Sequence, residues 1–494
     1  MAAESSDDGA SIRALAEAFA RVVAARGTAT AITTTDRSID AAGLAASAGG
    51  IAQGLREGSP HGTVILLPRD AIEFVCGALG AWAAGRSWFV ADPARASEVV
   101  SSLVPRLGAT AVVGESRDGA VATSLVPTMA WDCRPAPFEP TDGEEAYTVT
   151  YAMTSGSTAE PKLLPVRGRL YRDLVAGRSD EAEPGRGDVL MAAFSHVGVG
   201  LYLPIAAALL GAPLWSFDPI RIAPSAILPR AAELGVTYWL TVPSLLRRLL
   251  ALEHTAHPVP SLRTVATSGE ALHGEDVQSI RTVLGPDVMV AQRYGATEVG
   301  PIARHFVGPG EPAPPGPLPA GRPRDGIVVT IVDDAELPVP PGSVGRIRVE
   351  GQLGALNRDA MDLGDGQERL VLSDLGSIGP DGLLRLAGRE DRMVKVGGVR
   401  VEPGAVEDVL RRVPGVREVA VVPVPIPGGE HRLVAHVVLD RPDAVTPEAL
   451  RAAARASLTS MAVPARFVLG TDPLPLLPNG KLDRRSLIDR SRTA

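Results

Sequence analysis

Strand-like apolar runs alternate with helix-like segments in two long stretches of the chain, and this alternation constrains the fold more than any other feature. In the first stretch, strand-like runs lie at 63–67, 87–90 and 110–113, with helical periodicity at 12–25, after Asp70, and at 96–107. In the second stretch, 188–294, the strand-like runs are 189–194, 213–217, 236–240, 264–267 and 288–291. Because parallel strands need long crossovers between them, the sequence predicts α/β architecture with largely parallel sheets.

The chain changes character twice after this stretch. A proline-rich segment at 309–323 is followed by strand-like runs at 326–332 and 345–350, which we expect to pair antiparallel around a Pro-Gly turn. Near Arg389 a compact α+β pattern begins, with a helix at 405–413, strands at 418–424 and 432–439, and a helix capped by Thr446. We therefore expect an N-terminal region, 1–388, of α/β subdomains with a small β subdomain, and a small α+β C-terminal domain, 389–494.

Composition excludes several classes of protein. Hydrophobic residues make up 45% of the 494 residues and charged residues 21%, which is the balance of a chain that buries cores, so disorder throughout is excluded. The net charge of -8 argues against a nucleic-acid partner. Two cysteines, Cys76 and Cys133, are too few for a disulfide scaffold or a cysteine-rich zinc site. We expect no membrane span and a cytoplasmic location, since the acidic N-terminus lacks the basic and apolar regions of a secretory signal.

The first segment with chemical character is 151–162, Tyr-Ala-Met-Thr-Ser-Gly-Ser-Thr-Ala-Glu-Pro-Lys, in which a strand leads into hydroxyl groups, a glycine and a lysine. Such a loop can offer backbone N–H groups, hydroxyl donors and a cation to a polyphosphate. A solvent-exposed Ser/Thr turn is the alternative for this run taken alone. The common P-loop motif and the dinucleotide-binding glycine fingerprint are both absent from the sequence.

Together with three later motifs, this segment resembles the adenylate-forming superfamily of acyl- and aryl-CoA synthetases, peptide-synthetase adenylation domains and luciferases. The later motifs are Arg-Tyr-Gly-Ala-Thr-Glu at 293–298, Ser-Asp-Leu-Gly at 373–376 leading to Gly-Arg-Glu-Asp-Arg at 388–392, and Pro-Asn-Gly-Lys-Leu-Asp-Arg at 478–484. They occur in the family's order, and the resemblance covers almost the whole chain. One departure is Ala159, where the family's phosphate loop usually has glycine.

The resemblance implies an ATP- and Mg²⁺-dependent ligase that joins a carboxylate to AMP and then transfers the acyl group to a thiol. The residues that would hold the nucleotide are Thr154, Ser155, Gly156, Ser157, Thr158 and Lys162 at the phosphates, Gly269, Glu270, Ala271 and Tyr294 at adenine, and Asp374, Arg389 and Arg400 at the ribose and phosphate side. By the same resemblance, Thr297 would contact the α-phosphate, Glu298 would hold Mg²⁺, and Lys481 would bridge the carboxylate and the α-phosphate. Each residue taken alone also fits an ordinary core, turn or surface position.

The resemblance further implies a C-terminal domain that rotates about Asp391 between the two half-reactions. One orientation would bring Lys481 into the site, and the other would bring segment 393–401, including Gly397 and Gly398, which open a path for a thiol.

The sequence indicates the residues of the acid pocket less clearly than those of the nucleotide site. The residues that the resemblance places there are His196, Val197, Gly198, Leu201, Leu240, Ala266, Ser268, Arg293, Pro301 and Ile302. Val197 stands where members that activate α-amino acids carry aspartate, and a buried ammonium without a carboxylate partner is costly, so we expect an aryl, acyl or small dicarboxylic acid. An acidic residue elsewhere could still serve a displaced amine, as in a β-amino acid.

Arg293 leaves two alternatives for the acid. With Ser268 and His196 it resembles the cluster that malonyl-CoA synthetases use for a distal carboxylate. Alternatively, it forms an ion pair outside the pocket.

The acceptor is also open. The Asn-Gly-Lys-Leu-Asp-Arg motif is similar to adenylation domains that load phosphopantetheine on a carrier protein, whereas the His196 segment is similar to CoA ligases. Because no carrier domain follows Arg484 in this sequence, we expect a separate carrier protein, with free CoA as the alternative. Transfer of the adenylate to an amine, and a non-catalytic nucleotide-binding regulator, are the remaining hypotheses.

Overall fold

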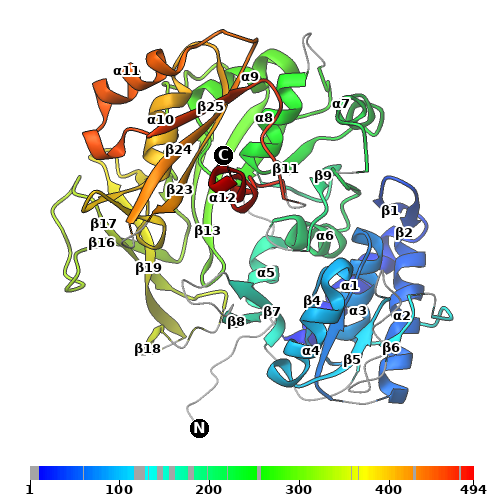
Figure 1. Cartoon of the computed structure of the whole chain (residues 1–494). Coiled ribbons are helices and arrows are strands. Elements are labelled where there is room, and N and C mark those ends of the chain that lie inside the picture. The colour runs from blue at the N-terminus through cyan, green and yellow to red at the C-terminus, as the bar shows by residue number, and fades with distance from the viewer. Residues whose placement is uncertain are drawn as a thin grey trace.

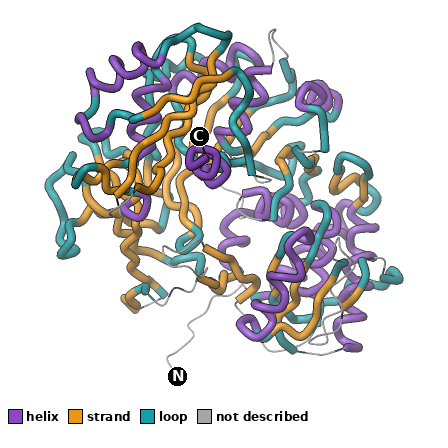
Figure 2. Tube along the Cα trace, viewed as in Figure 1, coloured by secondary structure: helices purple, strands orange, loops and turns teal. Residues whose placement is uncertain are grey.

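The computed structural model describes residues 11–58, 61–115, 128–131, 133–141, 148–154, 162–175, 183–196, 199–219, 221–252, 258–355, 357, 359–364, 366–426, 430–477 and 480–493. Within these residues the chain forms five sheets, two of them large and mostly parallel, with helices packed against them. Figures 1 and 2 show the arrangement of these sheets and helices. The α/β architecture expected from the alternating pattern is confirmed.

The largest sheet has nine strands in the order β15-β14-β13-β12-β11-β9-β10-β1-β2. Its strands are β1 (Thr30–Thr33), β2 (Ser38–Asp40), β9 (Leu190–Ala193), β10 (Leu214–Phe217), β11 (Tyr238–Thr241), β12 (Thr264–Ser268), β13 (Met289–Ala296), β14 (Gly300–Val307) and β15 (Arg322–Pro323). The five strands predicted between 188 and 294 all form, and they pair parallel to one another. Parallel pairing brings their carboxyl ends to one edge of the sheet, where the motif at 293–298 begins.

The second sheet has six strands in the order β6-β5-β3-β4-β7-β8. Its strands are β3 (Thr63–Leu66), β4 (Trp88–Val90), β5 (Ala109–Val113), β6 (Thr128–Met129), β7 (Thr148–Thr154) and β8 (Lys162–Arg167). β7 and β8 are antiparallel and pair Thr154 with Lys162. The predicted phosphate loop connects these two strands, and its residues 155–161 lie outside the described residues.

Helices cover both large sheets. They are α1 (Ile12–Arg26), α2 (Ala41–Gly58), α3 (Ala71–Ala83), α4 (Ala96–Leu107), α5 (Arg169–Val175), α6 (Val199–Leu210), α7 (Pro224–Glu233), α8 (Pro243–Leu252) and α9 (Gly274–Leu284), with a 3₁₀ turn, η1, at Pro93–Arg95. Asp70 caps α3 as predicted, because its side chain accepts a hydrogen bond from the Glu73 N–H. On the nine-stranded sheet, α6 packs on one face, and α7, α8 and α9 share a core with the other.

A smaller antiparallel sheet follows. Its strands are β16 (Ile327–Val332), β17 (Gly345–Gly351), β18 (Met361–Gly364), β19 (Gln367–Ile378) and β20 (Leu384–Arg389). β16 and β17 pair antiparallel as predicted. Its core also takes in Tyr294 and Ile302 from the nine-stranded sheet, so the end of β13 is anchored on both sides.

The remaining chain is called the tail, residues 390–493. Its elements are η2 (Glu390–Arg392), β21 (Val394–Val396), β22 (Val399–Val401), α10 (Pro403–Arg411), β23 (Val416–Ile426), β24 (Glu430–Leu439), α11 (Pro447–Ser457), η3 (Ser460–Ala462), β25 (Arg466–Gly470) and α12 (Arg484–Thr493). Two buried clusters of the tail draw only on tail residues. In Figure 1 the tail stands beside α8, α9 and β13, with α12 near the centre of the molecule.

Two further features bear on the expectations from the sequence. No helix among the described residues is long and apolar enough to cross a membrane. Cys76 and Cys133 are both free thiols.

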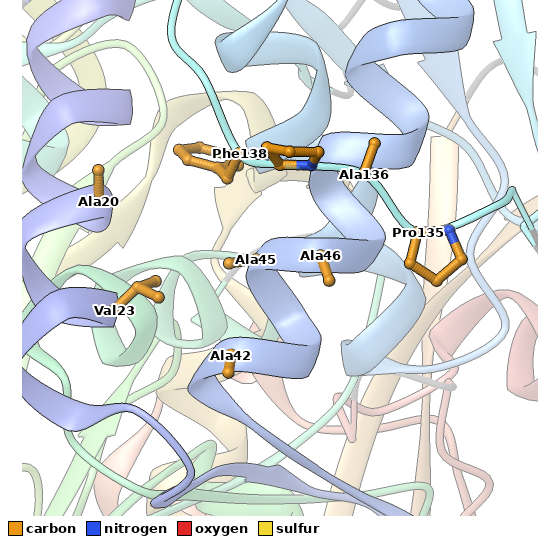
Figure 3. Close-up of a pocket in the computed structure, with 9 residues that line it drawn as sticks. Ala20, Val23, Ala42, Ala45, Ala46, Pro135, Ala136 and Phe138 are labelled. Atoms are coloured by element: carbon orange, nitrogen blue, oxygen red, sulfur yellow. The ribbon is translucent and has the colours of Figure 1, made fainter.

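An apolar hollow of about 430 Å³ lies between α1, α2 and segment 135–138 (Figure 3). Its lining residues are Ala20, Val23, Ala42, Ala45, Ala46, Pro135, Ala136, Pro137 and Phe138. None of them belongs to the motifs of the sequence, so this hollow is separate from the candidate site described below.

Candidate active site

Three motif residues meet where the ends of β13 and β20 approach the middle of β19. The Tyr294 hydroxyl donates to Asp374 Oδ2 at 3.0 Å, and Arg389 Nη1 lies 3.6 Å from Asp374 Oδ1. The register explains this meeting, because Asp374 and Arg389 are direct partners in the β19–β20 pair. Arg389 also donates to both carboxylate oxygens of Asp391, at 2.9 and 2.8 Å, and to Ser373 Oγ at 2.9 Å.

Burial governs the charges of this cluster. Tyr294 is 8% exposed and Asp374 9% exposed. Burial raises the pKa of Asp374, and the opposing effects of Arg389 and the Tyr294 hydrogen bond do not cancel that rise. Burial and the neighbouring Asp374 carboxylate raise the pKa of Tyr294 far above its usual range, so its hydroxyl remains a donor. The cluster therefore offers an aromatic ring, a carboxylate and a guanidinium side by side.

Lys481 reaches the same place from the tail. A Cβ placed on Gly269 would lie 2.7 Å from Lys481 Nζ, so the ammonium rests against the bare backbone that follows β12. Gly269 has φ +86°, a conformation in which L side chains are strained. Burial lowers the pKa of Lys481, Arg392 and Arg389 lower it further, and Glu270 opposes them. The lysine predicted from the C-terminal motif is thus next to the Gly269–Glu270–Ala271 segment.

The segment around Gly269 is held by short polar contacts. Glu270 Oε2 accepts from the Ser244 N–H at 2.9 Å, the Ala271 carbonyl accepts from Arg247 Nη2 at 2.9 Å, and the Leu272 N–H donates to Gln292 Oε1 at 2.8 Å. These bonds fix the backbone on which Lys481 rests.

Thr297 and Glu298 lie in the turn between β13 and β14. Thr297 is exposed, and Glu298 is close enough to Tyr294 and Arg389 to influence the pKa values of both. Among the described residues no group of three or more acidic, histidine or cysteine side chains could hold a metal ion. A single carboxylate such as Glu298 suits Mg²⁺ in a site where the substrate phosphates and water supply the other ligands.

Other predicted nucleotide residues lie outside this cluster or outside the described residues. Lys162 is 60% exposed, and its Nζ lies 3.3 Å from Asp359 Oδ2. Arg400 is 71% exposed on the tail, 3.8 Å from Glu390, and does not join the cluster in this orientation. The predicted loop residues Ser155, Gly156, Ser157 and Thr158, with Ala159, lie outside the described residues, as does the side chain of Thr154.

On the acid side, register places several predicted residues on one face of the nine-stranded sheet. Leu240 pairs with Ala266, Ala266 with Ala291, and Ser268 with Arg293. Since alternate residues of a strand share a face, Leu240, Ala266, Ser268 and Arg293 all project toward the side covered by α6. Arg293 therefore rises from the same surface as the residues expected to line the acid pocket.

Arg293 is engaged there by an acidic residue that the sequence did not reveal. Glu183, in the segment before β9, accepts from Arg293 Nη2 through Oε2, and from Arg304 Nη1 through Oε1 at 3.1 Å. The Arg293 guanidinium also lies 5.6 Å from the centre of the Tyr238 ring. The expected ion pair of Arg293 thus exists, but on the pocket face of the sheet. Glu183 belongs to no motif, and only the three-dimensional structure brings it beside Arg293.

The other predicted acid-pocket residues are dispersed. His196 Nε2 lies 2.8 Å from the Pro68 carbonyl oxygen, and its ring meets Phe194 edge-on. Leu201 packs against the core of α1, α2 and α3, and Ile302 is completely buried in the same cluster as Tyr294. Pro301 pairs with Gly295 at the start of β14. Val197 and Gly198 lie outside the described residues.

Comparison with known proteins places this geometry in context. A family model described as "AMP-binding enzyme" matches residues 19–356, and one described as "AMP-binding enzyme C-terminal domain" matches residues 405–481. The chain belongs to the AMP-binding enzyme family. The resemblance inferred from the four motifs is confirmed.

Two curated relatives illustrate the range of this family. The chain is 32% identical over 348 residues to an L-proline--[L-prolyl-carrier protein] ligase from Streptomyces coelicolor, covering 68% of this chain and 64% of that protein. It is 29% identical over 501 residues to a linear gramicidin synthase polypeptide from Brevibacillus parabrevis, covering 92% of this chain but 6% of that protein. The chain thus spans less than two thirds of the length of either relative.

Among solved structures, the amide bond synthetase from Marinactinospora thermotolerans has a TM-score of 0.77 and 23% identity, with 97% of this chain and 99% of that chain covered. This similarity shows the shared fold of a large N-terminal and a small C-terminal part. Enzymes of the AMP-binding family are ligases that use ATP to form acyl-adenylates.

Proposed function

We propose that this AMP-binding enzyme activates a carboxylic acid as its acyl-adenylate and then transfers the acyl group to the phosphopantetheine thiol of a separate carrier protein. The observation that carries the proposal is the position of Lys481, which the tail holds against Gly269, beside Glu270 and near Arg389. One cation from the tail thus lies against the Gly269 backbone, close enough to Arg389 of the Tyr294–Asp374 cluster for the two charges to interact.

Lys481 serves the first half-reaction. The carboxylate of the acid attacks the α-phosphate of ATP, the bond to the β-phosphate breaks, and pyrophosphate leaves. An ammonium between the two reacting anions offsets their repulsion and the charge that develops as the new bond forms. It therefore stabilises the transition state more than either bound reactant, and Thr297 donates to the α-phosphate beside it.

The nucleotide binds across the β13–β19–β20 cluster. Tyr294 stacks on adenine, whose edge follows Gly269, Glu270 and Ala271, and the Asp374 carboxylate accepts from the ribose hydroxyls. Arg389, held by Asp391, contacts the ribose and phosphate side, and Arg400 joins it only in another tail orientation. The phosphate loop with Lys162 holds the β- and γ-phosphates, and Glu298 would hold Mg²⁺, which would supply positive charge to the phosphates.

The charges on the acid side favour an acid whose side chain is uncharged. Arg293 and Arg304 share Glu183, so a second carboxylate on the acid would have to displace a partner already in place. An ammonium on the acid would face two guanidinium groups, and Glu183, a carboxylate beside them, is already engaged by both. We therefore propose an aryl or acyl monocarboxylic acid and place small dicarboxylic acids second.

Support for a carrier protein as the acceptor comes from the relatives. One curated relative is named as a ligase that acts on a carrier protein, and another is part of a gramicidin synthase. The Gly480–Lys481 motif has the pattern of carrier-loading enzymes, while free CoA and an amine are the competing acceptors.

The second half-reaction requires the tail to turn. We propose that the boundary lies at residues 388 and 389, that Asp391 is the hinge, and that the turn replaces Lys481 with segment 393–401. Gly397 and Gly398 have φ +54° and +82° and form the turn of the β21–β22 hairpin, where the lack of side chains would leave room for a thiol arm.

A panel of carboxylic acids tests this proposal. We expect ATP-dependent pyrophosphate release with one or a few aryl or acyl acids, and little release with dicarboxylic or β-amino acids. Hydroxylamine would trap the adenylate whichever acceptor is used, and competition between a carrier protein, CoA and an amine would then identify the acceptor. ATP binding without pyrophosphate release from any acid would contradict the proposal.

A further inference from the structure

A buried histidine lies where the tail meets the N-terminal region. His273, the residue before α9, is 4% exposed, and its Nε2 lies 2.8 Å from Asp408 Oδ1 of α10. The two residues are 135 positions apart in the chain. One side of this hydrogen bond therefore belongs to the N-terminal region and the other to the tail.

The N-terminal side of this contact is rigidly braced. Arg247 of α8 donates to both carboxylate oxygens of Asp276 at 2.7 Å, and Arg247 Nη2 lies 3.1 Å from His273 Nδ1. The His273 N–H donates to Asp276 Oδ2 at 2.8 Å. Because Arg247 donates at Nδ1, the ring carries its proton on Nε2, which faces Asp408. The contacts within the N-terminal region thus orient the imidazole to donate to Asp408 of the tail.

The tail side is less enclosed. The Asp408 side chain is 30% exposed, compared with 5% for the His273 side chain. Arg411, one turn further along α10, has a buried Nε, and its pKa is lowered by burial and by Arg247 while Asp276 and Asp408 oppose this. Arg412 approaches Gly316, where an added Cβ would lie 2.9 Å from its Nη2. Asp408 and Arg411 of α10, with Arg412 just after it, therefore face the N-terminal region, where Arg411 lies near both the like charge of Arg247 and the opposite charge of Asp276.

This interface and the position of Lys481 belong to the same orientation of the tail. Gly480, next to Lys481, would place an added Cβ 3.0 Å from Leu245 of α8, the helix that carries Arg247. Any rotation of the tail about Asp391 that withdraws Lys481 also separates Asp408 from His273. The Asp408–His273 contact and the position of the ammonium therefore occur in the same orientation of the tail.

We propose that His273 and Asp408 are a positioning pair for adenylate formation, which holds the tail in the orientation that delivers Lys481 and releases it for the second half-reaction. The pair touches neither ATP nor acid and acts through Lys481. This inference rests on the proposed function, because it assumes two half-reactions with different tail orientations.

The pair predicts an unequal effect on the two half-reactions. Loss of a hydrogen bond to a charged group, partly exposed here, weakens the adenylating orientation and reduces acid-dependent pyrophosphate exchange about five- to tenfold, through kcat rather than the KM for ATP. Transfer from the preformed adenylate to the acceptor should be unchanged or faster. The main variant is Asp408→Asn, which keeps the size of the side chain on the more exposed partner.

Three lysines in the whole chain, Lys162, Lys395 and Lys481, allow a second measurement that needs no acid substrate. An amine-acetylating N-hydroxysuccinimide ester, read by peptide mass spectrometry, reports the accessibility of each. In the wild type we expect half-buried Lys481 to react more slowly than exposed Lys162. In Asp408→Asn the Lys481 rate should rise about threefold or more, while the Lys162 rate stays constant.

Matched variants separate positioning from general stability. Asp489→Asn makes the same change at an exposed tail aspartate, 3.8 Å from Arg492, and should leave exchange and labelling unchanged. His273→Gln, which retains a donor, should recover most of the exchange lost in His273→Ala. The double variant His273→Gln/Asp408→Asn should be no slower than the worse single variant, because the two residues act through one contact.

The inference would be overturned if Asp408→Asn showed wild-type pyrophosphate exchange and wild-type Lys481 labelling. It would also be overturned if the variant lost activity equally in both half-reactions while the labelling of Lys481 stayed unchanged. Failure of the proposed function gives a different result. In that case the wild type releases no pyrophosphate with any acid, while the labelling of Lys481 in Asp408→Asn still shows whether the pair positions the tail.

Discussion

The nucleotide side and the acid side of the candidate site differ in how they are built. On the nucleotide side, Tyr294, Asp374 and Arg389 come from three strands of two sheets. Register pairs Asp374 with Arg389, a hydrogen bond joins Tyr294 to Asp374, and each residue belongs to a motif. On the acid side, Ala266 and Leu240 lie in motif-free strands, and Arg293 is balanced by Glu183 from an unrelated segment. We propose that the first pattern serves the reaction with ATP and the second the choice of acid.

This contrast indicates where chemistry and selectivity are separable in the enzyme. Substitutions on the nucleotide side should affect all acids equally, because every acid meets the same ATP. Substitutions around Glu183 should change the ranking of acids and leave the nucleotide unaffected. The following variants test that division, in order of decreasing effect.

Replacing Lys481 with alanine should reduce acid-dependent pyrophosphate exchange by about a thousandfold for every acid, because the transition state loses its bridging cation. ATP binding, measured by calorimetry, should change little. Near-wild-type exchange in Lys481→Ala would contradict the role of this residue and with it the division of the site.

Gly269→Ala should reduce exchange by about ten- to a hundredfold, because the new Cβ would occupy the place where Lys481 Nζ rests, 2.7 Å away. Gly235→Ala is the matched control. It has φ +67° and nothing within 4 Å of an added Cβ, so it carries similar backbone strain, about 1 kcal/mol, without touching the lysine. If both variants lose stability alike and Gly269→Ala keeps its exchange rate, Lys481 does not depend on that glycine.

Glu183→Gln should leave the KM for ATP unchanged and shift selectivity toward dicarboxylic acids by about tenfold, because Arg293 gains an unbalanced charge on the pocket face. The measurement is the ratio of kcat/KM for a dicarboxylic acid to that for a monocarboxylic acid of similar length. Glu233→Gln, on an exposed ion pair of α7, serves as the control. An unchanged ratio would place Arg293 and Glu183 away from the acid.

Tyr294→Phe should have the smallest effect, a two- to fivefold rise in the KM for ATP, since aromatic stacking survives and one hydrogen bond is lost. That bond helps to hold down the pKa of Asp374, which burial raises. Removal of the bond raises the pKa of Asp374 further, so the carboxylate becomes protonated at a higher pH. The acidic limb of the pH profile of the KM for ATP should therefore shift to higher pH. An identical pH profile in both proteins would show that Asp374 does not titrate during ATP binding.

Much of the fold was predictable because the local sequence patterns agree with the strand pairing in the structure. Alternating runs predicted the five parallel strands between 188 and 294, and short signals predicted the caps at Asp70 and Thr446. Helix α2 was not predicted, since its glycines at 49 and 50 weaken the helical signal. Their reason is structural: an added Cβ at Gly49 would lie 2.1 Å from the Ala136 carbonyl oxygen, so the helix needs bare backbone there.

The residues of the candidate site were predictable only where they belong to a sequence motif. Tyr294, Asp374, Arg389 and Lys481 were named from the sequence, and the structure brings them together, although their roles remain predictions. Glu183 could not be found, since one acidic residue in a loop has no local signature. The same holds for His273 and Asp408, which meet only through the placement of two domains. Arg400 was expected among the nucleotide residues, but in this orientation it faces Glu390.

The scarcity of lysine bears on the enzyme's own integrity. An acyl-adenylate is a reactive mixed anhydride that acylates primary amines, and this protein presents only three such side chains. Lys162 and Lys395 are exposed, whereas burial lowers the pKa of Lys481, so a larger share of its amine is unprotonated next to the reactive carbonyl. Self-acylation, if product release stalls, should therefore occur first at Lys481, the residue that we propose assists formation of the adenylate, and the enzyme would inactivate itself one molecule at a time.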